Sequence, residues 1–73
     1  MENMELHNEV KAYLLENKKV TLMEKGNHYD VWELVQTARG IKWKNHYAGK
    51  SGTVKDLTKF FEHIPKLILI RVL

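Results

Sequence analysis

The first apolar pattern in the chain repeats with the period of an α-helix. Four side chains fall on one stripe of such a helix: Leu6, Val10, Tyr13 and Leu14. The pattern therefore predicts an amphipathic helix over residues 4–16. Asn17 is its expected end, because asparagine tolerates the left-handed backbone conformation that closes many helices.

Three further segments are separated by turn-forming residues and have the pattern of β-strands. They predict strands over residues 19–25, 29–38 and 41–47. Gly26-Asn27 and Arg39-Gly40 lie between them, and glycine supplies the positive φ that tight turns require. We therefore expect two consecutive hairpins.

Alternation within these segments predicts which side chains share a face of the sheet. Ile41 and Trp43 point away from their lysine neighbours. If Arg39-Gly40 is a two-residue loop, Gln36 lies opposite Trp43. One face of the sheet then carries Trp32, Leu34, Ala38, Ile41, Trp43 and Tyr47.

Loop length sets the register of both hairpins. A three-residue first loop, residues 26–28, puts Val20 and Leu22 on the apolar face, whereas a two-residue loop turns them to the other side. In the second hairpin, the preferred register sets His46 across from Glu33 on the opposite, lysine-bearing face.

A second helix is predicted over residues 53–63. Thr53 is a suitable N-cap, and Asp56, three residues later, gives a variant of the capping box. Pro65 disfavours helical geometry at Ile64 and so ends the helix. The apolar stripe of this helix consists of Val54, Leu57, Phe60, Phe61 and Ile64.

The last apolar segment predicts a strand over residues 66–72, which needs a cover on both faces or a partner at its edge.

The predicted order of the elements is α-β-β-β-α-β. We therefore expect one small α+β domain over residues 1–73, with a single four-stranded, mostly antiparallel sheet and both helices on its aromatic face. A chain of 73 residues suits one domain, because it buries only roughly 60% of its unfolded surface.

Charge is distributed unevenly along the chain. The net charge is +3, yet residues 1–16 hold four acids against one base, whereas residues 39–55 hold five bases and no acid. A basic block of this kind is the usual electrostatic footprint of a polyanion site. It predicts an interface for DNA or RNA made by Arg39, Lys42, Lys44, His46, Lys50 and Lys55.

One alternative stays open for this block and another for Trp43. The basic block also fits an ordinary solvated sheet face, since net charge is a statement about partners and solubility rather than fold. Trp43 belongs to the core if it faces the helices. If the helices cover the other face, Trp32, Trp43 and Tyr47 form a stacking platform for unpaired bases.

Residue types that carry catalysis or bind metals are sparse. The chain has no cysteine, and its four histidines lie far apart in the sequence without a metal-binding spacing. Gly49-Lys50-Ser51 matches only the end of a phosphate-binding P-loop. We interpret it as a loop into the second helix, where Gly49, Gly52 and the free amides near Thr53 could hold one phosphate, helped by Lys50. We therefore expect a non-enzymatic protein without cofactor or metal.

A second hypothesis is a protein-binding module or inhibitor of the compact kind found in phages and mobile elements. It would act through the open sheet face or the last strand, by strand addition or as a homodimer. The longest apolar run, residues 67–70, is too short to cross a membrane, and residues 1–5 lack the order of a signal peptide. We therefore expect a cytoplasmic protein without membrane contact.

Overall fold

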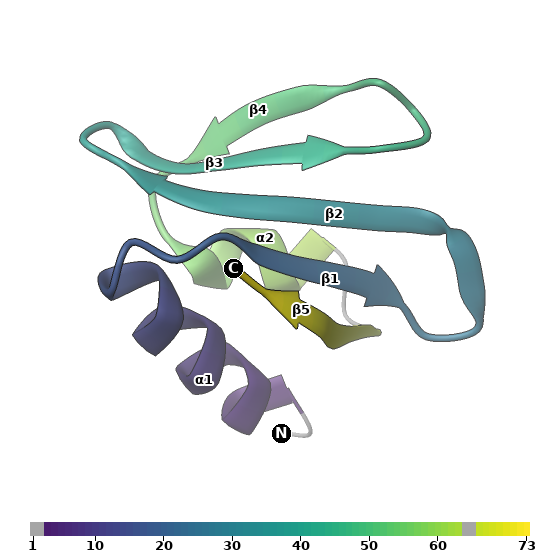
Figure 1. Ribbon diagram of the computed structural model, residues 1–73, viewed down its shortest axis with the longest axis horizontal. Helices are drawn as coiled ribbons and strands as arrows, with labels where there is room; N and C mark the ends of the chain where they lie inside the picture. The colour runs from purple at the N-terminus through teal and green to yellow at the C-terminus, as the bar shows by residue number, and fades with distance from the viewer. Residues whose placement is uncertain (1–2, 64–65) are drawn as a thin grey trace.

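The computed structural model describes residues 3–63 and 66–73, which form two helices and five strands (Figure 1). In chain order these are α1 (Asn3–Leu15), β1 (Val20–Glu24), β2 (Asn27–Thr37), β3 (Gly40–Asn45), β4 (Ser51–Val54), α2 (Leu57–His63) and β5 (Leu67–Val72). The α+β class is confirmed. The predicted order α-β-β-β-α-β is wrong, because it lacks β4.

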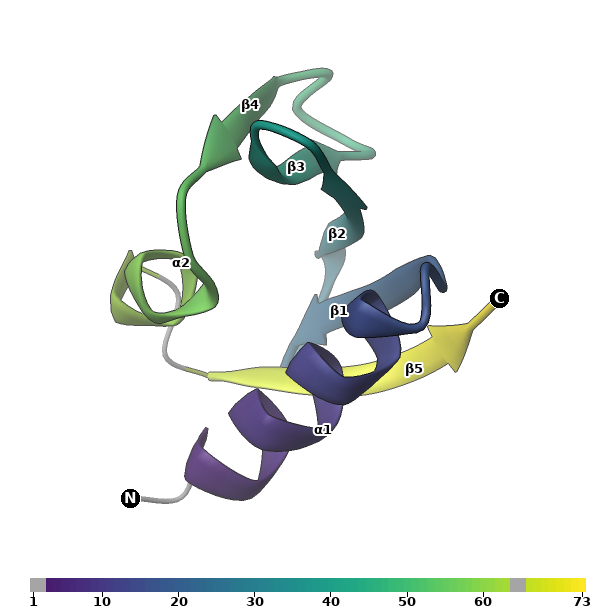
Figure 2. The ribbon, with the colours of Figure 1, turned by 90° about the vertical axis from the view of Figure 1, so that its left-hand side faces the viewer.

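All five strands form one antiparallel sheet in the order β4-β3-β2-β1-β5. The long strand β2 runs across the middle of the sheet (Figure 1). Figure 2 shows that the strands follow an arc, with α2 facing its hollow side. The predicted four-stranded sheet is thus corrected to five strands, with β4 at one edge and β5 at the other.

Strand β4 occupies a segment that was expected to be a loop and the start of a helix. Ser51 pairs with Lys44, and Gly52 pairs with Trp43. A Cβ on Gly52 would lie 2.8 Å from the Trp43 ring, so the indole packs directly on the backbone of β4. Glycine weakens a strand but permits such a close approach. This packing explains why a turn-like Ser-Gly-Thr sequence is a strand here.

The second helix therefore begins later than predicted, and its N-cap is Asp56 rather than Thr53. Asp56 Oδ1 accepts hydrogen bonds from the backbone N–H groups of Thr58 at 2.8 Å and Lys59 at 3.3 Å. Thr53 lies in β4, so the predicted phosphate-binding helix start at this position is wrong. The expected helix end at Ile64-Pro65 falls outside the described residues.

Helix α1 matches its predicted position to within one residue at each end. Val10 and Leu14 from its apolar stripe are 0% and 1% exposed. The N–H of Lys18 donates to the carbonyl of Tyr13 at 3.1 Å, and that of Asn17 donates to Leu14 at 3.0 Å. This is the Schellman pattern. Asn17 has φ of 60°, so its predicted role at the helix end is confirmed.

The first hairpin has the predicted register, and the second does not. Val20 pairs with Leu34 as predicted, although the turn itself is shorter than expected and the pairing beside it is irregular. In the second hairpin the turn is Ala38-Arg39, so Leu34 rather than Gln36 lies opposite Trp43.

Thr37 stabilises this earlier turn. Its hydroxyl donates to the carbonyl of Gly40 at 2.7 Å and accepts from the N–H of Arg39 at 3.3 Å. Gly40 has φ of 131°, a conformation that favours glycine. Because the pairing moves by an even number of residues, the same side chains still share each face of the sheet.

Both helices pack on the same face of the sheet around one core. The buried residues of this core are Val10, Leu14, Val20, Leu22, Leu34, Ile41, Leu57, Phe60, Phe61 and Leu67. Trp32 and Trp43 pack against it with their rings 5.3 Å apart, and the Trp32 ring lies 5.5 Å from Phe60. The core interpretation of Trp43 is confirmed, and a stacking platform built on the two indoles is wrong.

Strand β3 ends at Asn45, earlier than predicted. The Asn45 side chain is buried, with Nδ2 donating to Asp30 Oδ1 at 2.9 Å. Its Oδ1 accepts from the N–H groups of Tyr47 at 3.0 Å and Ala48 at 2.8 Å. These bonds turn the chain, so Tyr47 is 63% exposed rather than part of the core face. Ala38, also predicted on that face, is exposed in the β2–β3 turn.

Candidate nucleic-acid interface

The sheet face opposite the helices carries the alternate side chains of each strand, and we call it the open face. It consists of Lys19, Thr21, Met23, Val31, Glu33, Val35, Lys42, Lys44, His46, Ser51, Thr53, Ile68, Ile70 and Arg71. Strand pairing arranges these side chains in rows across the sheet. One row contains Lys44 on β3, Glu33 on β2, Thr21 on β1 and Arg71 on β5.

Lys42 and Lys44 are the exposed members of β3 on this face. Their neighbour Ile41 is 6% exposed, and Trp43 packs against the core. Since successive side chains of a strand point to opposite faces, the packing that holds the indole inward directs both ammonium groups into solvent. The predicted orientation of this strand is therefore confirmed.

Glu33 lies at the centre of the open face and is held by two basic side chains. Lys19 Nζ is 3.1 Å from Glu33 Oε1, and His46 Nε2 is 2.7 Å from Glu33 Oε2. The predicted contact between Glu33 and His46 is confirmed, although Lys44 is the residue directly opposite Glu33 in the ladder.

These contacts change the acidity of Glu33. Burial raises the pKa of its carboxyl, but hydrogen bonds from Lys19 and His46 and the charges of both groups lower it by more, so the pKa lies below its usual value. Glu33 is therefore ionised at neutral pH. It offsets part of the positive charge that the neighbouring lysines bring to the open face.

The other three predicted site residues lie away from the centre of this face. Arg39 is in the β2–β3 turn at one end of β3, and Lys50 is in the β3–β4 loop at the other end. Lys55 follows β4 and lines a cavity on the helix side. All three are exposed, but the structure brings together only half of the predicted set: Lys42, Lys44 and His46.

Two basic residues outside the predicted set lie on the open face, namely Lys19 and Arg71. Arg71 is placed there by its pairing with Thr21. The carbonyl of Lys19 accepts a hydrogen bond from the N–H of Leu73 at 2.8 Å, which extends the pairing between β1 and β5. Strand alternation could have placed Lys19 beside Thr21, but the position of Arg71 depends on the β1–β5 register.

Two shallow hollows flank Glu33 on the open face. One, of about 260 Å³, extends toward Lys42 and Lys44, and the other, of about 430 Å³, extends toward Arg71 on β5. Lys19 and Glu33 line both hollows. The Lys19–Glu33 ion pair therefore lies between two depressions that are each edged by basic side chains.

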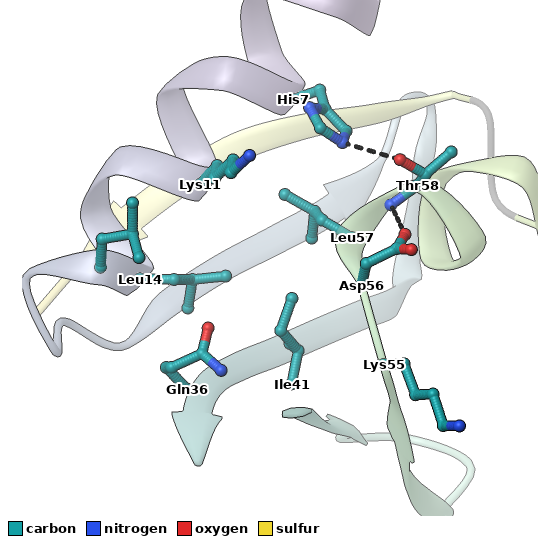
Figure 3. Close-up of a pocket in the computed structure, with 10 residues that line it drawn as sticks. His7, Lys11, Leu14, Gln36, Ile41, Lys55, Asp56, Leu57 and Thr58 are labelled. Atoms are coloured by element: carbon teal, nitrogen blue, oxygen red, sulfur yellow. Dashed lines mark hydrogen bonds between the residues drawn. The ribbon is translucent and has the colours of Figure 1, made fainter. Parts of the chain in front are cut away.

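A separate cavity of about 330 Å³ lies between α1, the start of α2 and one end of the sheet (Figure 3). His7 Nε2 lies 3.3 Å from Thr58 Oγ1 at its rim, a contact that joins the two helices. The Lys55 ammonium points away from this cavity in Figure 3. The apolar side chains labelled in this view are Leu14, Ile41 and Leu57.

Among the side chains that the structure describes, no three from His, Asp or Glu are grouped so that they could hold a metal ion. No helix in this described part of the chain has the length and apolar content needed to cross a bilayer.

Comparisons of the chain with protein-family models, with curated proteins and with solved structures gave no match. Function is therefore inferred from the charge and geometry of the chain itself.

Proposed function

We propose that this protein is a non-catalytic domain that binds nucleic acid by contacting phosphates through the open face. The observation that carries the proposal is the exposure of Lys42 and Lys44 on a sheet face that neither helix covers. Lys19, His46 and Arg71 are on the same face. Glu33 is the one acid that the described residues place there, and Lys19 and His46 already contact its carboxylate.

Lysines that neutralise phosphates release condensed counterions, so the resulting affinity falls steeply as salt rises. Contacts of this kind position a nucleic acid without reading its sequence. The proposed ligand is therefore the phosphate backbone of DNA or RNA, bound with little base preference. The proposal includes a cytoplasmic location, where such polymers are present.

The test is fluorescence anisotropy with labelled DNA probes between about 50 and 200 mM salt, the range over which phosphate contacts are strongly screened. A Lys42→Gln/Lys44→Gln variant removes two open-face charges. A Lys11→Gln/Lys59→Gln variant removes two exposed charges from the helices and serves as the matched control for net charge.

We expect wild-type affinity to fall with salt, and the open-face variant to reduce the slope of log affinity against log salt by about 2. The helix variant should retain most of the slope. Binding that is undetectable at low salt, or that does not change with salt, would contradict the proposal. Equal losses in both variants would show a general effect of net charge.

The edge strand β5 supports a second candidate function, docking by strand addition. Ile68 and Ile70 are 38% and 47% exposed in a strand at the edge of the sheet, and such edges pair readily with other strands. Sedimentation velocity over a concentration series tests this. A dimer that Ile68→Lys abolishes supports the candidate, and a monomer at every concentration argues against self-association.

A further inference from the structure

The basic side chains of the open face form two ridges that meet at Glu33, which contacts Lys19 of one ridge and His46 of the other. The β3 ridge consists of Lys42, Lys44 and His46, and the β5 ridge consists of Arg71 on β5 and Lys19, which precedes β1. We propose that the nucleic acid bound here is double-stranded DNA, with one phosphate backbone on each ridge. This inference rests on the proposed function and names the form of its ligand.

Lys44 of the β3 ridge and Arg71 of the β5 ridge are separated by a distance that suits a duplex. Lys44, Glu33, Thr21 and Arg71 lie in one row across four adjacent strands. Neighbouring strands are about 4.8 Å apart, which places the backbones of Lys44 and Arg71 about 14 Å apart. The major groove of B-form DNA is about 12 Å wide and admits a two-stranded β-ribbon, and β2 and β1 are the two strands between Lys44 and Arg71. Lys44 and Arg71 can therefore reach the two borders of one groove.

The shape of the sheet agrees with this arrangement. The strands follow an arc whose hollow side holds the core, so the open face is the outer, convex side (Figure 2). The middle strand β2 presents Val31, Glu33 and Val35 between the ridges. A convex face flanked by cations complements a groove flanked by phosphates.

A single strand is a poorer fit to the same face. Unpaired bases are held mainly by stacking on exposed aromatic rings. Trp32 and Trp43 instead pack against the core on the helix side. A single strand also has one backbone, which would engage one ridge and leave the other without a phosphate.

Duplex RNA is a poorer fit as well, because the A-form major groove is deep and narrow. Across this major groove the two backbones lie too close for both ridges. Engagement of both ridges is therefore the property that separates duplex DNA from the other two forms.

The experiment compares three labelled probes of the same sequence and length: duplex DNA, one of its strands alone, and duplex RNA. Each is titrated over the same salt series with the wild type and two variants. Lys42→Gln/Lys44→Gln alters the β3 ridge, and Lys19→Gln/Arg71→Gln alters the β5 ridge. Circular dichroism confirms that both variants fold.

We expect duplex DNA to bind at least about tenfold more tightly than the other probes, and each ridge variant to lower its salt slope by about 2. Equal or tighter binding of the single strand or of duplex RNA would overturn the inference. A decrease in the slope of log affinity against log salt that is confined to the β3 ridge variant would also overturn the inference. In both cases the proposed function would stand, whereas no binding of any probe would remove the function itself.

Discussion

The imidazole of His46 contacts the carboxylate of Glu33 on the neighbouring strand, with Nε2 and Oε2 2.7 Å apart. Lys19 binds the second oxygen of the same carboxylate at 3.1 Å. One acid therefore engages a base from each ridge of the open face. This links the stability of the sheet to the charge that the face presents, and both effects can be measured with one substitution.

The first prediction concerns binding. Glu33→Gln removes the one acid on the open face within the described chain and releases Lys19 and His46 toward phosphates. We expect affinity for duplex DNA at low salt to rise about fivefold, since a nearby unit charge contributes on the order of 1 kcal/mol. Glu62→Gln makes the same charge change at an exposed position of α2. If both variants bind alike, the position of Glu33 has no special role.

The second prediction concerns acid stability. Because the pKa of Glu33 is lowered in the folded protein, its ionised form stabilises the fold above the usual value of 4.5. That contribution is lost as the pH falls through the folded pKa. Wild type should therefore be more stable than Glu33→Gln at neutral pH, and the difference should shrink below that usual value. Urea unfolding at a series of pH values measures it, and a gap independent of pH would contradict the prediction.

The third prediction concerns the packing of β3 on β4. In Gly52→Ala the new Cβ would lie 2.8 Å from the Trp43 ring. We expect a loss of about 1–3 kcal/mol in the free energy of unfolding, the usual range for overpacking. Ser51→Ala, at the exposed neighbouring position, should stay within about 0.5 kcal/mol of wild type. Thermal unfolding of the two variants checks this, and equal stability would show that the indole moves aside freely.

The fourth prediction distinguishes the two residues that could begin the second helix. Asp56→Ala removes the acceptor for the N–H groups of Thr58 and Lys59 and should destabilise the protein by about 1 kcal/mol. Thr53→Ala changes an exposed position of β4 and should stay within about 0.5 kcal/mol. Chemical denaturation gives the free energy of unfolding of both variants. A larger loss in Thr53→Ala than in Asp56→Ala would show that Thr53 is the N-cap.

Local patterns predicted several features because one strong physical preference decided each of them. Burial of Val20 opposite Leu34 sets the register of the first hairpin, since a slip by one residue would expose both. Burial of Ile41 and Trp43 likewise sets the orientation of β3, so alternation correctly predicts that its lysines point into solvent. The second hairpin was predicted with the wrong pairing but the right faces, because an even shift leaves the alternation unchanged.

Features that depend on contacts between distant segments could not be predicted in the same way. Strand β4 has a turn-like composition, and Gly52 is in a strand because the Trp43 ring lies against it. Arg71 joins the open face only through the β1–β5 ladder, whose register shifts between Thr21 and Leu22. Three of the six predicted binding residues lie near the ends of β3 or on the helix side, since sequence proximity does not determine the direction of a loop side chain.

The open face, with its two basic ridges, is the surface that we propose to bind nucleic acid. The most direct measurement is a ¹H–¹⁵N NMR titration of the protein with a short DNA duplex. We predict that the shifted amides cluster at Lys42, Lys44 and His46 on one side and at Lys19 and Arg71 on the other, and that added salt reverses the shifts. Shifts confined to α1 and α2, or no shifts at low salt, would contradict binding through the open face.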